Sequence, residues 1–251
     1  MIKLVKKDLK LFFSNRQNML LTFALPIIII TLFSLVFGNM GNTEHDKLGG
    51  LVHVVAGTSV MMLLFSVAGI GGSLLDEKQE GMLKKLLCAP IQPSNILYAK
   101  LVYANIISIF QLIIMFLFAW LAFGLDIVHY LPSLFLMILA TAYACSGFGI
   151  LLAPFAKSRQ QVQGYSTLVV LVMSAMGGSM IPLFIMPDFM QKIAVVSVNY
   201  WGIQGFFDIF LRQLPITDFT FLSRVLVLLG IGSLLNFTAL LMFRRTIQKM
   251  V

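Results

Sequence analysis

Long runs without a single charged side chain recur along the sequence, and they constrain its fold more than any other feature. Each of six segments is strongly apolar and contains no Asp, Glu, Lys or Arg. A helix of about twenty such residues is long enough to cross the hydrocarbon core of a bilayer. We therefore predict an all-α polytopic membrane protein with six transmembrane helices. The predicted spans are residues 19–38, 51–75, 101–123, 131–156, 165–186 and 225–243.

The composition excludes an ordinary soluble domain. Only 11% of the 251 residues are charged and the mean hydropathy is +0.94, whereas about a quarter of the residues of a soluble domain are charged. The first apolar run is too long for the core of a signal peptide, and no small-residue cleavage site follows it. We expect this run to be retained as the first transmembrane helix of a single transmembrane domain, residues 1–251.

The distribution of basic residues predicts the orientation of the spans. Most of the 18 Lys and Arg residues fall in the N-terminal tail, in the 76–100 loop, after the fourth span and at the C-terminus. Loops rich in Lys and Arg stay on the cytoplasmic side of a membrane, so both termini and the 76–100 loop are expected there. This topology accounts for the net charge of +8 without a nucleic-acid partner.

Residues 1–17 are predicted to form an amphipathic helix that lies in the membrane interface. Ile2, Val5, Leu9 and Phe12 recur at helical spacing, and the lysines fall largely on the opposite side. A basic amphipathic helix directly before a span is typical of an interfacial segment. The alternative is a basic tail that serves only to orient the first span.

The stretch after the fifth span is less regular. Pro182 and Pro187 interrupt helical structure near the outer end of that span, and Trp201 belongs to a residue type that favours the bilayer interface. Charged residues keep the stretch from crossing the membrane cleanly. We predict short re-entrant or interfacial helices in residues 187–215, on the outer side and covered by protein or water.

The sequence lacks the residue patterns of an enzyme or a metal site. It contains no phosphate-binding G-x-x-x-x-G-K-[ST] motif, no metal-spaced histidines and no G-x-S-x-G nucleophile. We therefore expect no catalytic residue, no metal site and no cofactor in this chain. The spans also lack the charges that ion-driven carriers bind and release, which indicates an external energy source. The glycines of residues 69–73 are instead predicted to allow close helix packing.

The 76–90 segment is the most polar internal part of the chain. Ser73 is positioned to cap a helix whose early residues include Asp76 and Glu77 and whose later residues are basic, an order of charges that suits the helix dipole. Pro90 is expected to end this helix. The result is a short amphipathic helix on the cytoplasmic face. From the residues alone, it either docks into a soluble partner or rests on lipid headgroups.

This segment resembles the signature of ABC-2 type transporter permeases. Residues 77–91 read EKQEGMLKKLLCAPI, with an acidic-basic pair, a glycine, leucines and a proline at the spacings of that family. A second stretch, residues 181–212, is similar to the family's segment after the fifth span. Met82 and Lys84 replace the family's usual threonine and acidic residue, so the contacts to a partner are expected to differ. The matching residues are Glu77, Lys78, Gly81, Leu83, Leu86, Leu87, Pro90 and Lys100.

The resemblance implies the transmembrane subunit of a bacterial ABC exporter in the plasma (inner) membrane. Two such permeases, identical or paralogous, would pair above two copies of a separate ATPase that binds ATP and Mg²⁺. The 76–90 helix would pass the movement of the ATPase to the second and third spans, and the permease itself would not be an enzyme. The residues expected at this ATPase-coupling contact are Glu77, Lys78, Glu80, Gly81, Leu83, Leu86, Leu87 and Pro90.

The resemblance also places a dimer face on the second and fifth spans. Six Met and Phe residues there are candidates to line the pathway of a hydrophobic or amphipathic substrate, such as a drug, an antibiotic or a lipid-like molecule. The alternative is that they pack against lipid or neighbouring helices. Three other functions stay open: a gradient-driven carrier or channel, a membrane anchor and a membrane enzyme. The pathway candidates are Met61, Met62, Phe65, Met173, Met176 and Met180.

Overall fold

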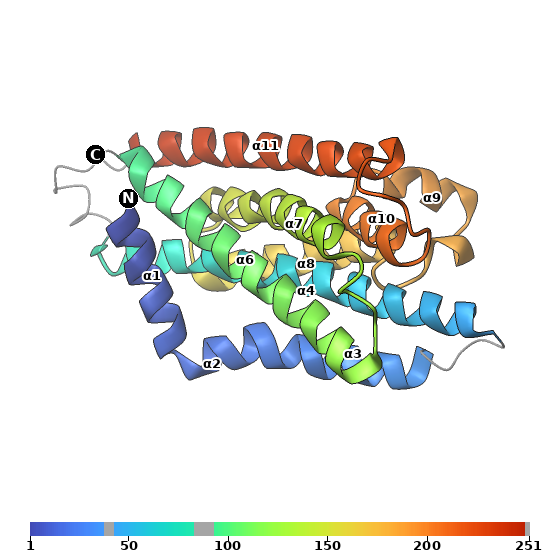
Figure 1. Ribbon diagram of the computed structural model, residues 1–251. Coiled ribbons are helices and arrows are strands. Elements are labelled where there is room, and N and C mark those ends of the chain that lie inside the picture. The colour runs from blue at the N-terminus through green and yellow to red at the C-terminus, as the bar shows by residue number, and fades with distance from the viewer. Residues whose placement is uncertain (38–42, 83–92, 249–251) are drawn as a thin grey trace.

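The computed structural model describes residues 1–37, 43–82 and 93–248, and in these ranges the chain forms helices and no β-strand. Most of the long helices run close to one common direction (Figure 1). The bounds of the elements are α1 Ile2–Ser14, α2 Arg16–Met19, η1 Leu20–Ala24, α3 Leu25–Phe37, α4 Glu44–Gln79, α6 Pro93–Phe123, α7 Leu131–Leu152, η2 Ala153–Phe155, α8 Arg159–Met176, η3 Leu183–Ile185, α9 Asp188–Ala194, α10 Val198–Phe210 and α11 Phe219–Gln248.

Five helical stretches are long and apolar enough to cross a membrane. They coincide with the first, second, third, fourth and sixth predicted spans, which confirms an all-α membrane protein. The first stretch joins α2, η1 and α3 into one span. The five stretches are Arg16–Val36, Asp46–Glu77, Asn95–Phe123, Leu131–Phe155 and Phe219–Met242.

The fifth predicted span, residues 165–186, was wrong in its bounds. The helix α8 already begins at Arg159 and ends at Met176, and its first turns carry an arginine and three glutamines. These polar residues exclude α8 from the five apolar stretches. The helix stops because Gly178 adopts a left-handed backbone conformation with φ of 90°, and Pro182 follows before the short 3-10 helix η3.

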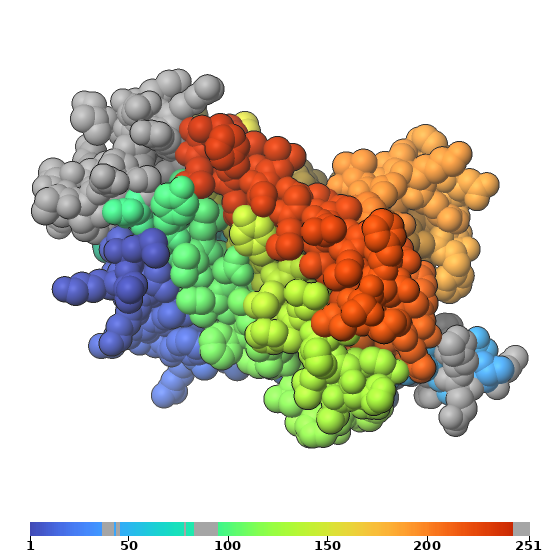
Figure 2. Space-filling view, turned by 45° about the horizontal axis from the view of Figure 1, so that its top comes forward, coloured from blue at the N-terminus to red at the C-terminus, as the bar shows by residue number. Residues whose placement is uncertain are grey.

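The segment predicted to re-enter the membrane forms two helices that meet at a sharp bend. The axes of α9 and α10 are inclined by 94°, and the Trp201 indole N–H donates to the Val195 carbonyl oxygen across the bend at 2.7 Å. Pro187 directly precedes α9. Figure 2 shows the region around α9 standing out from the bundle at one end. The re-entrant placement of this pair stays a prediction.

The helices α4 and α7 form the centre of the bundle, and their backbones touch. A Cβ atom placed on Gly149 would overlap the Val67 carbonyl oxygen, and one placed on Gly71 would overlap the carbonyl oxygen of Gly149. Only glycine permits this approach, so the prediction of close helix packing at residues 69–73 is confirmed for Gly71. A Cβ on Gly72 would meet the Arg159 side chain, and one on Gly69 would have nothing within 4 Å. In Figure 1, α11 lies along one edge of this centre and α2–α3 along the other.

The N-terminal helix α1 crosses one end of the bundle at a steep angle to α2 and α3 (Figure 1). Its Val5 and Phe12 are buried, whereas Lys3, Lys6 and Lys10 are exposed. The predicted amphipathic pattern is therefore present in the helix, and its apolar side packs against α6. Its position in the membrane interface stays a prediction.

Candidate functional site

Three helices that are distant in sequence bring buried charges together at one end of the bundle. The Lys100 ammonium group of α6 lies 2.9 Å from Asp8 Oδ2 of α1 and 3.0 Å from Glu77 Oε1 of α4. The side chains of Lys100 and Asp8 are 6% exposed and that of Glu77 is 12% exposed. A buried lysine between two carboxylates joins these three helices electrostatically, because each of the three charges is largely removed from water and lies beside an opposite charge.

A second lysine completes this group, which we call the Lys100 cluster: Lys7, Asp8, Glu77 and Lys100. Lys7 Nζ lies 3.1 Å from Glu77 Oε1 and 3.3 Å from Asp8 Oδ1. Partial burial alone would lower the pKa of Lys7, but the attraction of Glu77 and Asp8 outweighs it and raises the pKa above 10.5. Two lysines and two carboxylates compensate each other, so the cluster as a whole is neutral.

The sequence builds the cluster from residues that look unrelated. Asp8 lies on the buried side of α1, three residues after Val5 and four before Phe12, so the same turn spacing that buries the apolar residues also buries the acid. Sequence analysis missed Asp8. The sequence could have indicated it, because Asp8 is the one acidic residue of a helix whose other charged residues are lysines, and it lies on the apolar face.

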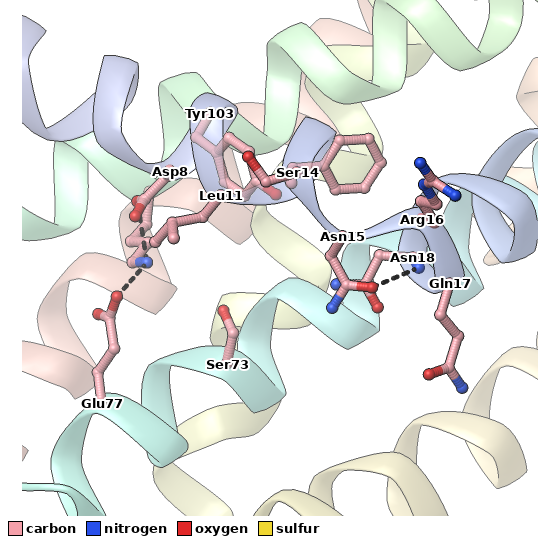
Figure 3. A pocket seen from close by; sticks show the side chains of 12 residues that line it. Asp8, Leu11, Ser14, Asn15, Arg16, Gln17, Asn18, Ser73, Glu77 and Tyr103 are labelled. Atoms are coloured by element: carbon pink, nitrogen blue, oxygen red, sulfur yellow. Dashed lines mark hydrogen bonds and ion pairs between the residues drawn. The ribbon is translucent and has the colours of Figure 1, made fainter.

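A cavity of about 640 Å³ opens beside the Lys100 cluster. Figure 3 shows Asp8, Glu77 and Ser73 on one side of it and Asn15, Arg16 and Asn18 on the other. One wall is apolar, and the remainder is rich in amide and hydroxyl groups. The lining residues are Asp8, Leu11, Phe12, Ser14, Asn15, Arg16, Gln17, Asn18, Ser73, Glu77, Lys100 and Tyr103.

The helix α4 runs further than the sequence predicted. The hydroxyl group of Ser73 donates to the carbonyl oxygen of Ile70 at 2.7 Å within the helix, so the prediction that Ser73 caps a new helix was wrong. Asp76 and Glu77 belong to the last turns of α4, which ends at Gln79. The predicted boundary between a span and a separate 76–90 helix therefore does not fall at residue 76, because α4 is continuous there.

The exposed side of the end of α4 is tied to the segment before α8. Asp76 Oδ2 accepts from Arg159 at 2.7 Å, and the Gln79 side-chain amide donates to the Lys157 carbonyl oxygen at 2.9 Å. The last turns of α4 thus contact α1 and α6 on one side and the α7–α8 connection on the other.

Two further coupling candidates lie directly after α4. Glu80 is exposed, and Gly81 has φ of 71° with nothing within 4 Å of the place where a Cβ would stand. Among the described residues, Gly81 is therefore required by the backbone turn and not by a close neighbour. The side chain of Lys78 and the remaining residues of the predicted 76–90 helix lie outside the described residues; these are Leu83, Leu86, Leu87 and Pro90.

A second buried charge group lies at the opposite end of the bundle, and we call it the Asp208 cluster: Gln204, Asp208, Arg212 and Arg224. The Asp208 side chain is 0% exposed; Oδ1 accepts from Arg212, and Oδ2 lies 3.3 Å from Arg224 Nε. Gln204 Oε1 accepts from Arg212 at 3.0 Å. The guanidinium group of Arg224 also lies over the ring of Trp201, 5.4 Å from its centroid. Sequence analysis placed Trp201 at the interface but missed this network. The spacing of Asp208 and Arg212, four residues apart, could have indicated an ion pair there.

A family model described as "ABC-2 type transporter" matches residues 1–211 of the chain. The chain belongs to the ABC-2 type transporter family. Together with its apolar helices, this makes it the membrane permease subunit of an ABC transporter.

Curated relatives are similar along most of the permease. It is 27% identical to the linearmycin resistance permease protein LnrN of Bacillus subtilis over 191 residues, which is 74% of this chain and 46% of LnrN. It is 25% identical to the inner membrane transport permease YadH of Escherichia coli over 185 residues, 72% of each chain. The inner membrane transport permease YhhJ of the same organism is 24% identical over 228 residues, 83% of this chain and 54% of YhhJ.

The pathway candidates of the permease lie on two neighbouring elements. Met61, Met62 and Phe65 of α4 are half-buried, as are Met173 and Met176 of α8. The two helices pack together. Met180 lies beyond the end of α8 and is 54% exposed. The structure thus brings the two groups onto adjacent helices, and their role in transport stays a prediction.

Within the described part of the permease, no three His, Cys, Asp or Glu side chains are grouped so that they could hold a metal ion. The carboxylates of the Lys100 cluster already face two lysines. The interactions that the described side chains make at this site are ion pairs between α1, α4 and α6.

Proposed function

We propose that this permease is the membrane half of an ATP-driven exporter for hydrophobic or amphipathic compounds and is powered by a separate ATPase chain. The observation that supports it best is the Lys100 cluster. It lies at the end of α4, where the predicted ATPase-coupling residues begin with Glu77, and it connects that end to α1 and α6.

In this mechanism, ATP and Mg²⁺ bind to the ATPase, whose movement displaces the chain after Gln79. Glu77 transmits the displacement because its carboxylate is paired with Lys100 and Lys7, and leaving a buried charge without its partner costs several kcal/mol, roughly 3–5. The coupling role proposed for Glu77 is therefore internal: its side chain faces α1 and α6, and it acts on the third span through Lys100.

The remaining parts of the proposal follow from the family. A second permease, a copy of this chain or a paralogue, would complete the pathway along α4 and α8, and both termini would lie in the cytoplasm of a bacterial cell whose inner membrane holds the complex. The name of LnrN, a resistance permease, supports an antibiotic-like or lipid-like substrate. The Met and Phe residues of α4 and α8 suit such compounds.

The test compares two neighbouring acids on α4. The permease and its co-purifying ATPase are reconstituted in liposomes, and substrate-stimulated ATP turnover and transport are measured for Glu77→Gln and Asp76→Asn. Asp76 is the matched control, since its side chain is 31% exposed and that of its partner Arg159 is 53% exposed, and ion pairs that reach solvent contribute less than buried ones. We expect Glu77→Gln to lower stimulated turnover and transport about tenfold or more, with ATPase binding retained, and Asp76→Asn to keep both.

Two results would contradict the proposal. If no P-loop ATPase co-purifies and the permease alone moves solute down an ion gradient, the protein is a gradient-driven carrier. If an ATPase is present but Glu77→Gln and Asp76→Asn behave alike, coupling does not run through the Lys100 cluster.

A further inference from the structure

The cavity beside the Lys100 cluster lies at the level where three spans begin or end. Its lining includes Arg16, where the first span begins, and Glu77, where the second span ends; Lys100 follows a few residues after the start of the third span at Asn95. Such a level corresponds to the boundary between the hydrocarbon core and the lipid headgroups. The volume of about 640 Å³ falls in the range of roughly 300–1,000 Å³ that is usual for sites of small molecules.

The walls of this cavity match an amphiphile. Leu11, Phe12 and Tyr103 form an apolar side, and the amide side chains of Asn15, Gln17 and Asn18 together with two serine hydroxyl groups form a polar side. The side-chain oxygen of Asn15 already accepts from the Asn18 backbone, so its NH₂ group is left to donate to a ligand.

The charges of the lining favour an anion. The acids Asp8 and Glu77 are compensated by Lys100 and Lys7, whereas no carboxylate of the described chain lies within ion-pair distance of Arg16. Figure 3 shows Arg16 on the opposite side of the cavity from Glu77. The exposed lysines of α1 add positive charge near the cavity and attract anionic lipids to this part of the protein.

We infer that the cavity binds the headgroup of an anionic phospholipid from the adjoining leaflet. Its phosphate is held by the guanidinium group of Arg16 and by neighbouring amide and hydroxyl donors, and its acyl chains leave along Leu11 and the exposed apolar residues Leu20 and Leu21. Arginine suits this task because its planar group donates two parallel hydrogen bonds to a phosphate. The bound lipid would brace α1 and α2 against α4, beside the Lys100 cluster.

The experiment uses the full-length permease, delipidated in a mild detergent, with short-chain phosphatidylglycerol as the probe. Binding is measured by native mass spectrometry and by the rise in the thermal unfolding midpoint. Phosphatidylcholine and inorganic phosphate at the same concentrations separate an anionic lipid from a zwitterionic lipid and from free phosphate. We expect phosphatidylglycerol alone to bind and to raise the midpoint.

Two variants address the cavity, each with a matched control. Arg16→Gln removes the unpaired cation, and Lys3→Gln removes the same charge from the exposed side of α1. Ser73→Leu fills the cavity, and Ser223→Leu changes a serine with the same hydroxyl-to-carbonyl bond in α11, that of Ser223 to Thr220. We expect Arg16→Gln and Ser73→Leu each to weaken phosphatidylglycerol binding about tenfold, and both controls to change it less than about twofold.

Three results would overturn the inference. Equal losses for Arg16→Gln and Lys3→Gln would show attraction by the surface charge of α1 without a site. Equal binding of inorganic phosphate or phosphatidylcholine would show a site that does not select an anionic lipid. Unchanged binding in a folded Ser73→Leu variant would place the lipid outside the cavity. None of these results depends on whether an ATPase partner exists, so the proposed function is tested separately.

Discussion

The two buried charge clusters are built differently. The Lys100 cluster lies where α1, the end of α4 and the start of α6 meet, and the Asp208 cluster lies on α10 and the start of α11; Figure 1 shows these two groups of elements at opposite ends of the bundle. The Lys100 cluster joins three helices that are far apart in sequence, and its charges cancel. The Asp208 cluster is local: Asp208 and Arg212 are four residues apart, Arg224 follows at the start of α11, and one carboxylate faces two cations. The first cluster opens onto a cavity, and the second packs against aromatic rings. In the proposed mechanism the Lys100 cluster transmits movement between helices, whereas the Asp208 cluster ties α10 to α11.

The largest expected effect is a loss of stability on changing the Lys100 cluster. Lys100→Met removes the cation shared by Asp8 and Glu77 and leaves two buried carboxylates with Lys7 as their one remaining partner. We expect the free energy of unfolding to fall by about 3–5 kcal/mol, measured by thermal unfolding in detergent. The control Lys192→Met removes an exposed lysine from α9 and should leave the unfolding midpoint nearly unchanged. A loss in Lys100→Met no larger than in this control would mean that the cluster does not hold α1, α4 and α6 together.

A smaller loss of stability is expected on changing the Asp208 cluster. Asp208→Asn keeps the shape of the side chain but removes the buried negative charge between Arg212 and Arg224, of which Arg212 is 45% exposed. We expect a loss of about 1–3 kcal/mol, smaller than that of Lys100→Met since Arg212 can turn to water. The ratio of stimulated to basal ATP turnover should stay unchanged, with the exposed acid variant Asp188→Asn as control. A lost stimulation would show that the Asp208 cluster also takes part in coupling.

The smallest effect concerns the turns that follow α4 and α10. Gly81 and Gln213 both have a left-handed backbone, with φ of 71° and 51°, but only glycine adopts it without strain. Gly81→Ala should therefore destabilise the fold by about 1 kcal/mol and Gln213→Gly should stabilise it by up to about the same amount. Gly164→Ala, in the middle of α8 with open space around it, serves as the control for an ordinary backbone. Equal shifts for Gly81→Ala and Gly164→Ala would contradict the assigned turn.

The spans that could be predicted from sequence were those whose boundaries coincide with a change in composition. The run from 131 to 156 agrees closely with the stretch Leu131–Phe155, because both its ends are marked by polar residues. The bounds of the fifth span were wrong because the apolar run starts only after the glutamines that open α8, whereas the helix already begins at Arg159. At the other end, Gly178 turns the chain before the apolar residues end.

The candidate site was only partly visible in the sequence. Glu77 and Lys100 could be selected from the family motif, but the meeting of Lys100 with Asp8 joins residues that only the packing of α1 on α6 brings together. Ser73 illustrates the reverse error: serine before acidic residues is typical of a helix start, yet here its hydroxyl group bonds inside a helix that was already formed. Local sequence preferences therefore indicate which hydrogen bonds a side chain can form, and the tertiary packing decides which of these bonds is present.

The contact between Gly149 and the backbone of α4 has a mechanical consequence. Where two helices meet through side chains, a change of rotamer can absorb a small displacement of one helix before the other responds. Between Val67 and Gly149 no side chain intervenes, so a rotamer change cannot absorb a displacement at this contact. In the proposed mechanism, a displacement of α4 would therefore be passed to α7 at this contact without being absorbed by side chains.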